Sequence, residues 1–322
     1  KKWLEYRLSI GCLYQSIGNE NVKRLVVLHH TRFTNGSCPY TKGIIDKNDV
    51  VLAPNGVDES HCNIDNVFIK ILSLIYIPSV IVKLCFFGIF RLQTRTLHLL
   101  CYYELWRVLL RQLGIEKLVL VVAYDPWNRA ISAAGRSLNL EVTEVQHGVV
   151  NKSHRAYSKY CKSHWRQHGI TEFLYWDFML PYVSDVFGDM VGLHQVEHKS
   201  LVRTDSNLKL NSVAIIGQKP YQDILLKLGA DLVRRGFEVL YKTHPNETLI
   251  SEVVSVVNSL VEIDNSKYKI AVDSTLLLEY SNCSKKGEVL IQLKRKGSFY
   301  FDRTENILLL DYEDVFERIS KI

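Results

Sequence analysis

Two short stretches place polar side chains directly after an apolar run. The first is Tyr-Lys-Thr-His-Pro-Asn-Glu at 241–247. Within it, Lys242 and His244 alternate onto one side of a predicted strand, and Pro245 fixes the chain as it leaves. The second is Ile-Ala-Val-Asp-Ser-Thr at 270–275, where a predicted strand opens into a helix. Cations, imidazole donors and the free N–H groups of a helix N-terminus all bind anions. Because open α/β sheets bind ligands at the carboxyl ends of their strands, the two stretches predict one pocket for a phosphorylated ligand.

Most residues of the predicted phosphate pocket are expected to bind the phosphate, and one is expected to bind the ribose of a nucleotide. Its members are Lys242, His244, Pro245, Asn246, Ser274, Thr275 and Glu279. A cation and an imidazole suit a phosphate or pyrophosphate leaving group. The hydroxyls of Ser274 and Thr275 can cap the helix and bind phosphate at the same time. Glu279, about one helical turn later, could accept hydrogen bonds from ribose hydroxyls. A structural role for the Lys-x-His-Pro unit is the alternative.

A third group of polar residues lies in the first half of the chain, between 124 and 157. An apolar strand ends in His147-Gly148, which places a general base for near-neutral pH at the carboxyl edge of a sheet. Asp125, after the preceding strand, is an alternative base, and it could equally cap the following helix. Glu144 alternates to the other face of its strand and is expected away from His147. The residues expected to surround an acceptor are Tyr124, Arg129, His154 and Tyr157.

These residues depend on two series of alternating strands and helices. Such alternation predicts βαβ units and parallel sheets. Strands are expected at 24–30, 50–53, 117–124, 141–146, 173–176, 213–217, 238–242, 268–272, 288–293 and 307–310. Helices are expected at 97–113, 127–138, 221–235, 247–260, 274–283 and 313–320. The stretch 180–211 looks irregular and is expected to contain the boundary between two domains, 1–195 and 196–322.

Composition fits a folded protein that handles small anions. The 322 residues are 47% hydrophobic and 23% charged, and the formal charge of +6 is spread along the chain, unlike the basic stripe of a nucleic-acid-binding protein. Seven cysteines without a CxxC pair predict neither a disulfide framework nor a metal site, and they favour a cytoplasmic compartment. The sequence contains no Walker loop and no GxGxxG, HExxH, GxSxG or DxD motif. We therefore expect no metal, no tightly bound cofactor and no nucleic-acid partner.

The stretch 67–90 is the most apolar part of the chain. Its length suits a membrane-spanning helix of roughly 20 residues, but Lys70, Pro78 and Lys83 interrupt it. Buried or amphipathic helices are therefore favoured, with an interfacial helix on a membrane surface and a true span as alternatives.

Taken in order, the motifs resemble those of bacterial glycosyltransferases of the GT-B fold that build capsules and lipopolysaccharide O-antigens. Among these enzymes, the metal-independent sialyl- and Kdo-type transferases have a similar His-Pro motif and a later Ser-Ser or Ser-Thr motif. Teichoic-acid glycerophosphotransferases share a His-Gly, His-Pro, Ser-Ser pattern. The resemblance covers roughly 118–281. It implies an α/β, GT-B-like architecture of two Rossmann-like domains facing a central cleft, with the acceptor bound by 1–195 and the donor by 196–322.

The resemblance also implies roles for individual residues. His244 would contact the donor phosphate and help the nucleotide monophosphate to leave, and Ser274 and Thr275 would hold the same phosphate. The base would come from the first half. The sialyltransferases with this pattern use an acidic residue of an acidic-acidic-Gly motif, which Gln-His-Gly at 146–148 replaces here. His147 matches the glycerophosphotransferase version, and Asp125 and Glu144 stay open as alternatives.

The hypothesis from the sequence is an inverting, metal-independent glycosyltransferase of surface-polysaccharide synthesis. The favoured donor is CMP-sialic acid or a related CMP-ulosonic acid, because a CMP-linked sugar leaves a single phosphate that one histidine and one hydroxyl pair can stabilise. The acceptor is expected to be a lipid-linked or oligosaccharide hydroxyl at the inner face of the cytoplasmic membrane. Alternatives are a UDP-sugar or CDP-glycerol donor, a non-catalytic nucleotide-binding assembly protein on the same fold, and a sugar-nucleotide epimerase.

Overall fold

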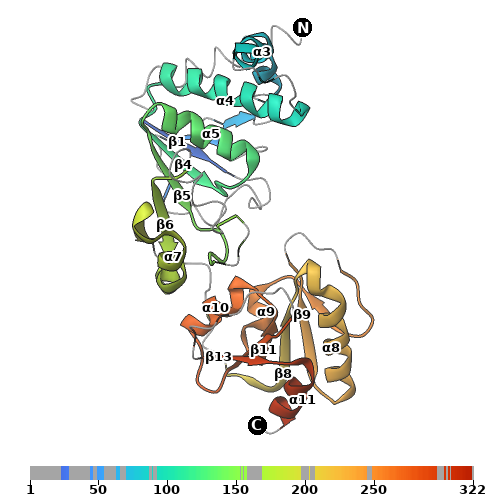
Figure 1. Cartoon of the computed structure of the whole chain (residues 1–322). Coiled ribbons are helices and arrows are strands. Elements are labelled where there is room, and N and C mark those ends of the chain that lie inside the picture. Colours follow the sequence, from blue (N-terminus) through green and yellow to red (C-terminus); the bar gives the residue numbers. More distant parts are fainter. Residues whose placement is uncertain are drawn as a thin grey trace. The chain divides into compact units, whose positions relative to one another are not determined.

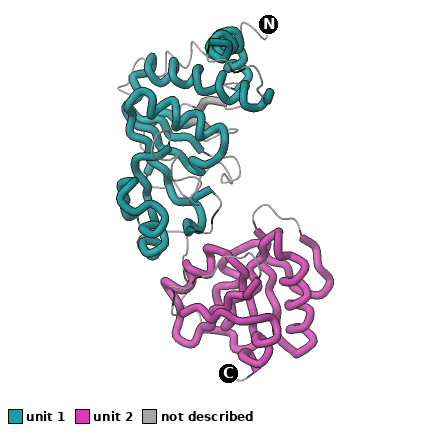
Figure 2. The backbone as a smooth tube through the Cα atoms, in the orientation of Figure 1, with its two compact units in different colours: residues 1–196 teal, residues 197–322 magenta. Residues whose placement is uncertain are grey.

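The computed structural model forms two compact units, Lys1–Val196 and Glu197–Ile322 (Figure 2). The structure describes residues 23–28, 44–45, 49–53, 63–65, 70–86, 89, 93–152, 154, 156–157, 169–196, 203, 207–244, 249–295, 301, 304 and 306–320. Each unit is built around one parallel sheet, so the expected α/β fold with parallel sheets is confirmed.

The sheet of unit 1 has seven parallel strands in the order β3-β2-β1-β4-β5-β6-β7. Their bounds are β1 Arg24–Val27, β2 Val50–Ala53, β3 Asn63–Asp65, β4 Lys117–Val121, β5 Glu141–Val145, β6 Glu172–Trp176 and β7 Gly192–Val196. Strand β4, Lys-Leu-Val-Leu-Val, is a short apolar segment of the kind that is typical of strands buried on both faces. The chain reverses its direction of winding between β1 and β4, and ligands of open α/β sheets bind beside such a switch point.

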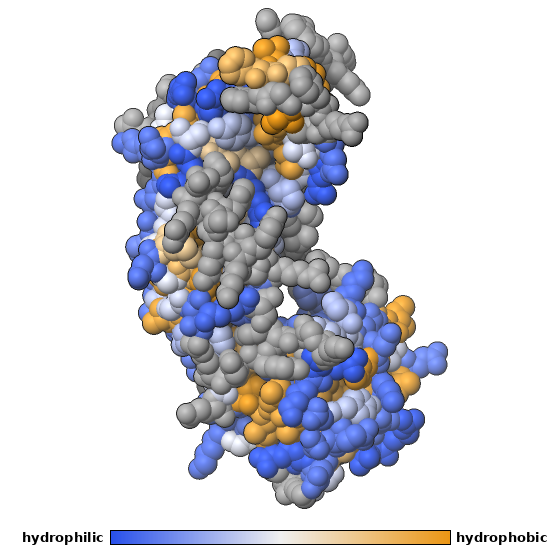
Figure 3. All heavy atoms as spheres, in the orientation of Figure 1, coloured by the Kyte–Doolittle hydropathy of each residue, from blue (hydrophilic) through white to orange (hydrophobic). Residues whose placement is uncertain are grey.

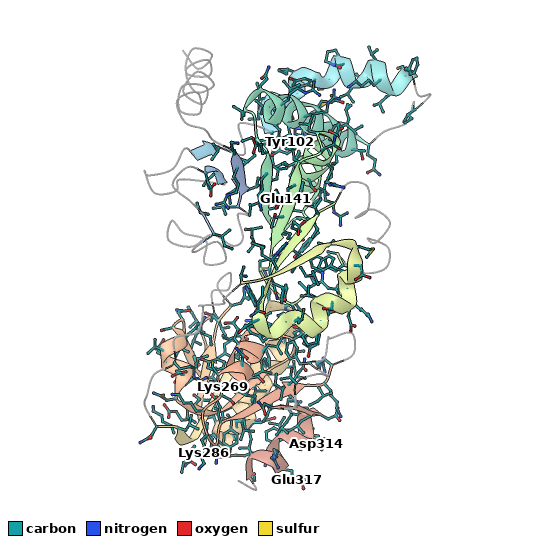
Figure 4. The ribbon with its side chains drawn as sticks, turned by 90° about the vertical axis from the view of Figure 1, so that its left-hand side faces the viewer. Tyr102, Glu141, Lys269, Lys286, Asp314 and Glu317 are labelled. Atoms are coloured by element: carbon teal, nitrogen blue, oxygen red, sulfur yellow. The ribbon has the colours of Figure 1, made fainter. Side chains whose placement is uncertain are left out.

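The helices of unit 1 form layers on this sheet (Figure 1). They are η3 Ser73–Tyr76, α3 Ile77–Phe86, α4 Thr94–Gln112, α5 Pro126–Ser137, η4 Asp177–Met179, α7 Leu180–Phe187 and η5 Gly188–Met190. Helix α5 packs on β4 and β5 so closely that a Cβ at Gly135 would lie 2.4 Å from a methyl carbon of Leu118. Helix α4 packs on α5, with the buried Tyr102 ring (labelled in Figure 4) edge-on to Trp127 at a centroid distance of 5.1 Å. Helix α3 and η3 lie against α4.

The sheet of unit 2 has six parallel strands in the order β10-β9-β8-β11-β12-β13. The bounds are β8 Lys209–Ile216, β9 Glu238–Lys242, β10 Ser255–Val257, β11 Ser266–Ala271, β12 Val289–Leu293 and β13 Ile307–Leu310. The helices are η6 Lys219–Tyr221, α8 Gln222–Arg234, α9 Leu260–Asp264, α10 Thr275–Asn282 and α11 Tyr312–Ser320. Figure 1 shows α8 and α10 on opposite sides of the sheet. Numbered within the unit, the strand order is 3-2-1-4-5-6, the order of dinucleotide-binding folds, with its switch point between β8 and β11.

A buried ionic network stabilises the amino ends of the strands in unit 2. Lys269 on β11, labelled in Figure 4, has no exposed surface, and its ammonium lies 2.5 Å from the Glu288 carboxylate. Arg203 contacts both Glu288 and Asp264 at 2.9 Å, and Lys285 contacts Asp264 at 3.0 Å. Buried charges need such partners because an unpaired ion in the interior costs several kcal/mol. The network lies at the edge of the sheet opposite to the strand ends discussed below.

Two predictions about the elements are wrong. The stretch 180–211 is not irregular over its described part, since that part contains α7 and the edge strand β7. The helix expected at 247–260 does not form over its described part; instead Ser255–Val257 pairs with β9 as β10, and α9 begins at Leu260. The apolar spacing looked helical, but consecutive valines favour a strand where a neighbouring strand can pair with them. The start of α9 had a recognisable signal, a capping box formed by Ser259 and Glu262.

In the part of the chain that the structure describes, no helix is both long and apolar enough to cross a membrane. Residues 73–86 of the apolar stretch form η3 and α3 instead.

Candidate functional site

The carboxyl ends of β4 and β5 bring a tyrosine and a histidine together. Tyr124 follows β4 and His147 follows β5, and the Tyr124 hydroxyl lies 3.0 Å from His147 Nε2. Either group can donate in this bond. If the phenol donates, Nδ1 of the imidazole carries the proton, whereas an Nε2–H donor leaves Nδ1 as the basic nitrogen. His147 is buried, with 4% of its surface exposed, and Tyr124 is half-buried.

A second hydrogen-bonded pair lies directly beside the first. The Tyr157 hydroxyl donates to Glu144 Oε1 at 2.7 Å, and the backbone N–H of Ala123 donates to the same oxygen at 3.0 Å. The ring of Tyr157 packs edge-on against Tyr124 at 5.4 Å, and His154 stacks beside both at 5.0–5.3 Å. Glu144 therefore joins the group that surrounds His147, contrary to the expectation that strand alternation would keep it away.

The turn after β4 has a strained backbone. Val122 has a φ of 65°, a conformation that a β-branched residue rarely adopts and that costs on the order of 1–3 kcal/mol. Three side-chain interactions hold the turn: the Ala123 N–H bond to Glu144, and two bonds from the Asn128 amide to the carbonyls of Val121 and Val122, at 3.1 and 3.0 Å. Strained backbone of this kind concentrates at functional sites.

Asp125 acts as the N-cap of α5. Its carboxylate accepts from the Trp127 N–H at 2.9 Å, and Pro126 occupies the first helical position, which suits proline. Asp125 thus has the capping role that the sequence left open beside that of a base. Arg129, in the first turn of the same helix, is near enough to Glu144 to lower its pKa by charge attraction.

Gln146 is a site residue that the sequence analysis did not single out as one. Its side chain is fully buried; the amide group donates to the Gly148 carbonyl at 2.9 Å, and the amide oxygen accepts from the Trp176 N–H at 2.9 Å. Gln146 therefore fixes the His147-Gly148 segment against the end of β6. A glutamine directly after an apolar strand, followed by a histidine and a glycine, was the available signal.

Glu144 is the most perturbed carboxyl group near the site. Burial raises its pKa to about 7, against the lowering effects of the Tyr157 and Ala123 hydrogen bonds and of Arg129. Its Oε1 accepts both hydrogen bonds, while no donor among the described residues lies within hydrogen-bond distance of its Oε2. The group therefore changes its charge close to neutral pH.

In unit 2, the candidate site lies at the end of β8, between the ends of β9 and β11. Neighbouring strands are about 4.8 Å apart, so the ends of β9 and β11 lie roughly 10 Å from each other. Gly217, after β8, donates its N–H to the Lys242 carbonyl at 2.7 Å, and a Cβ there would come within 2.8 Å of that same oxygen. Only glycine allows this close approach of β8 and β9.

Gln218 and Tyr221 connect β8 to the turn that precedes α10. The Gln218 amide oxygen accepts from the N–H groups of Val272 and Asp273 at 3.2 and 3.1 Å, and its amide nitrogen donates to the Asp273 carboxylate. The Tyr221 hydroxyl donates to the other Asp273 oxygen at 3.1 Å. Burial raises the pKa of Asp273 despite these bonds. The sequence analysis missed both Gln218 and Tyr221.

Ser274 and Thr275 begin α10. The Ser274 hydroxyl is the N-cap and accepts from the Leu276 N–H at 3.3 Å, and Thr275 is the first helical residue. The N–H groups of Val272, Asp273 and Leu276 thus have side-chain partners. The first turn of a helix presents its remaining N–H groups and the positive end of its dipole to an anion. Glu279 lies in α10 and is half-buried.

The residues at the end of β9 lie at the same edge of the sheet. Lys242 is buried, and its ammonium donates to the Thr243 carbonyl at 2.7 Å. His244 is half-buried, and Pro245 and Asn246 lie outside the described residues. The structure therefore brings His244, Gln218 and the start of α10 to three adjacent strand ends, while the Lys242 ammonium is bonded to backbone. No group of three or more histidine, cysteine or acidic side chains suited to a metal ion occurs among the described residues.

No protein-family model matches the sequence, and no curated protein matches it. Solved structures do match the fold. UDP-GlcNAc 2-epimerase from Methanocaldococcus jannaschii has a TM-score of 0.54 at 8% identity, over 93% of this chain and 91% of that one. A glycosyltransferase from Rickettsia africae has 0.51 at 11%, over 94% and 88%, and MurG from Acinetobacter baumannii has 0.50 at 10%, over 93% and 90%. The chain thus has the GT-B-like fold that glycosyltransferases and these epimerases share.

The raised pKa of Glu144 predicts a pH-dependent effect of Glu144→Gln on stability. The folded protein holds a proton on Glu144 up to about pH 7, whereas the unfolded chain releases it near 4.5, so wild-type stability falls as pH rises through this interval. Glutamine cannot ionise. The free energies of unfolding of Glu144→Gln and of the wild type are measured by urea denaturation of the full chain. The value for the variant minus the value for the wild type should increase by up to about 3 kcal/mol between pH 5 and pH 8.

Glu116→Gln serves as the matched control, because its side chain is 63% exposed and is paired with the equally exposed Lys23. Its stability difference from the wild type should stay nearly constant over the same pH range. A constant difference for Glu144→Gln as well would contradict the assignment of a buried, neutral-pH carboxyl group.

Proposed function

We propose that the chain is an inverting, metal-independent glycosyltransferase of surface-polysaccharide synthesis, with a CMP-linked sialic or other ulosonic acid as the favoured donor. The observation that carries the proposal is the clustering of His244, Gln218 and the Ser274-Thr275 helix start at the switch point of a 3-2-1-4-5-6 sheet. Nucleotides bind at this position in open α/β sheets. The GT-B-like fold supports the proposal, since it is shared with glycosyltransferases.

In the proposed reaction, unit 2 binds the donor. The N–H groups and hydroxyls at the start of α10 hold the phosphate, His244 donates a hydrogen bond to it, and Glu279 binds ribose hydroxyls. As the bond between the anomeric carbon and the phosphate oxygen breaks, negative charge collects on the departing CMP. Donors that already point at the phosphate stabilise this charge without reorganisation. Lys242, Pro245 and Asn246 belong to the proposed donor site, where the buried Lys242 ammonium adds positive charge behind the phosphate.

Unit 1 is proposed to bind the acceptor. His147 takes the proton from the acceptor hydroxyl while the new carbon–oxygen bond forms, and Tyr124 orients the imidazole through its bond to Nε2. Arg129, His154 and Tyr157 complete the acceptor site, and Asp125 positions α5 as its cap. A single displacement of this kind inverts the configuration at the anomeric carbon.

Nucleotide binding tests the donor half of the proposal. A ligand that binds only the folded state raises the unfolding midpoint by mass action, by about 2.7 kcal/mol at a hundredfold excess over Kd. We expect CMP to raise the midpoint without magnesium, and His244→Ala to weaken CMP binding about tenfold or more, which is about 1.4 kcal/mol.

The matched control is His194→Ala, which removes a 59% exposed histidine from β7 in unit 1 and should leave CMP binding unchanged. A stronger response to UDP or CDP would keep the donor site and replace the donor. No response to any nucleotide would refute the proposed donor site.

Transfer assays test the acceptor half. His147→Ala should lower kcat by about 10²- to 10⁴-fold, the usual contribution of a general base, while CMP affinity stays at the wild-type value. Turnover is measured with the CMP-sugar and a glycan acceptor, and affinity by calorimetry with CMP. His194→Ala should leave both quantities unchanged. An equal loss of turnover in the two variants would show that the effect is not specific to the site.

The proposal places transfer at the inner face of the cytoplasmic membrane, with peripheral contact through η3 and α3. Several large apolar side chains on and directly beside these two helices are exposed: Ile71, Leu74, Ile75, Ile81, Val82, Phe86 and Ile89. Figure 3 shows hydrophobic residues gathered at the end of unit 1 where Figure 1 labels α3. An apolar helix face can bury itself in the boundary between headgroups and acyl chains.

Vesicle binding tests this contact. Ile75 and Val82 are 63% and 69% exposed, so the double variant Ile75→Ser/Val82→Ser removes apolar area at little cost to folding. It should sediment several-fold less with phosphatidylglycerol vesicles than the wild type, because each buried CH₂ contributes about 0.8 kcal/mol. Val261→Ser in unit 2, at a site 61% exposed, is the control and should bind as the wild type does. Equal binding by both variants would contradict a contact through α3.

One other function has specific support, and two further alternatives differ from the proposal in their expected test results. The fold is also that of proteins described as UDP-GlcNAc 2-epimerases, so a UDP-sugar epimerase is a second candidate, which would act on its substrate without any acceptor. A UDP-sugar or CDP-glycerol transferase would need the acceptor but prefer another nucleotide. A non-catalytic nucleotide-binding assembly protein would retain nucleotide affinity and be indifferent to His147→Ala.

A further inference from the structure

The carboxylate of Glu144 connects two segments that carry the proposed acceptor residues. Through Ala123 it fixes the backbone directly before Tyr124, and through Tyr157 it fixes a ring that packs on Tyr124. Tyr124 in turn is bonded to His147. Both links from Glu144 therefore end on the same hydrogen-bonded pair.

Because the backbone at Val122 is strained, the hydrogen bond between Ala123 and Glu144 is important for the conformation of this turn. A β-branched residue at a φ of 65° returns to an extended conformation unless its neighbours prevent it. The Ala123 N–H bond to Glu144 is one of the interactions that prevent this, and a hydrogen bond to a charged acceptor is roughly twice as strong as one to a neutral acceptor. The charge of Glu144 therefore affects how firmly the turn before Tyr124 is held.

The second link has the same dependence on charge. The Tyr157 hydroxyl donates to Glu144 at 2.7 Å, and an ionised acceptor strengthens such a bond. Protonation of Glu144 leaves Oε1 as a weaker acceptor, and it adds an O–H donor at the buried Oε2, beside which no acceptor or donor contact occurs among the described residues. Both links are thus weaker in the neutral form.

We propose that Glu144 is a positioning residue of the acceptor site and that its ionised carboxylate holds Tyr124 and His147 in the arrangement that accepts a proton. The inference rests on the proposed function in so far as that arrangement serves transfer to an acceptor. Glu144 itself touches neither substrate. It acts through Tyr157 and through the turn after β4.

The titratable and charged groups around Glu144 come from three segments. Arg129 on α5 attracts the ionised form, Tyr157 donates to it, and the imidazoles of His147 and His154 lie beyond the tyrosine rings. Since the Tyr157 bond lowers the pKa of Glu144, Tyr157→Phe should raise that pKa further. Glu144→Gln should remove the titration altogether.

The pH profile of transfer separates positioning from a general structural role. In the wild type, kcat/KM for the acceptor should fall as pH drops below about 7, where Glu144 gains its proton. For Glu144→Gln, kcat/KM should be at least tenfold lower at pH 8 and should not show the fall at low pH that protonation of Glu144 causes. For Tyr157→Phe, the fall should remain but begin at a higher pH. A uniform loss in Glu144→Gln, with the wild-type profile retained, would overturn the proposal.

A spectroscopic measurement tests the inference without any turnover. Tyrosines labelled with ¹³C at Cζ report their hydrogen bonding, and the measurement stays below the reference pKa of a tyrosine side chain, about 10. In a His147→Ala/His154→Ala background, where neither imidazole contributes, the signals of Tyr124 and Tyr157 should share one inflection near pH 7. Tyr124→Phe and Tyr157→Phe variants assign the two signals, and Glu144→Gln should abolish the inflection in both.

The two measurements can fail independently. A shared inflection without transfer activity would keep Glu144 as the charged residue that holds the Tyr124 turn and would remove the proposed function. Transfer activity with a Tyr124 signal that ignores Glu144 would keep the proposed function and overturn this inference. If Glu144→Gln does not fold, Tyr157→Phe still decides, because its inflection at Tyr124 must move to higher pH.

Discussion

Every strand of each sheet runs in the same direction, and this constraint determines where the candidate chemistry can lie. Parallel pairing gathers all carboxyl ends of the strands at one edge and sends the chain away from that edge through a turn into a helix. In unit 1 this edge carries Tyr124 and His147. In unit 2 it carries His244 and the start of α10. The opposite edge of unit 2 holds the ionic network around Lys269, which stabilises the sheet and contributes nothing to this edge.

In both units, glutamine side chains form hydrogen bonds with backbone groups at the ends of neighbouring parallel strands. Strands that end beside one another leave backbone N–H and C=O groups without ladder partners, and buried groups of this kind must be satisfied. Gln146 bonds the ends of β5 and β6, and Gln218 bonds the ends of β8 and β11. Gln292 does the same at β12, where it donates to the Val272 carbonyl at 2.6 Å and accepts from the Phe301 N–H at 2.9 Å. An amide side chain suits this position because it supplies a donor and an acceptor together.

The sequence predicted the central strands well and the edges poorly. Strand β4 is a mostly apolar run, which is typical of a strand buried on both faces. Strands β5, β9 and β11 contain polar residues but are buried over most of their length, and the alternation of strands with helices indicated them. The edge strands β7 and β10 are short and partly exposed, and they form because a neighbouring strand offers its backbone groups. That cause is tertiary, and no local pattern encodes it. For the same reason the helical spacing around 247–260 was misleading, although the Ser259 capping box marked the true start of α9.

The residues of the candidate sites also differ in whether the sequence alone could predict them. Residues that follow a strand directly, such as His147 and Ser274, could be predicted, because parallel topology alone assigns them to the edge. Glu144 could not, since strand alternation predicts only the face on which a side chain starts and not the partner that its carboxylate reaches. Its contact with Tyr157 depends on the chain returning to β5 after a loop, and its raised pKa depends on the burial that this return completes. Asp273 shows a similar combination in unit 2, a half-buried carboxyl group with a tyrosine donor and a raised pKa. In both units a carboxylate and a phenol thus hold the turn at which the proposed substrate groups would lie, and the burial that completes each pair also makes its charge costly to keep.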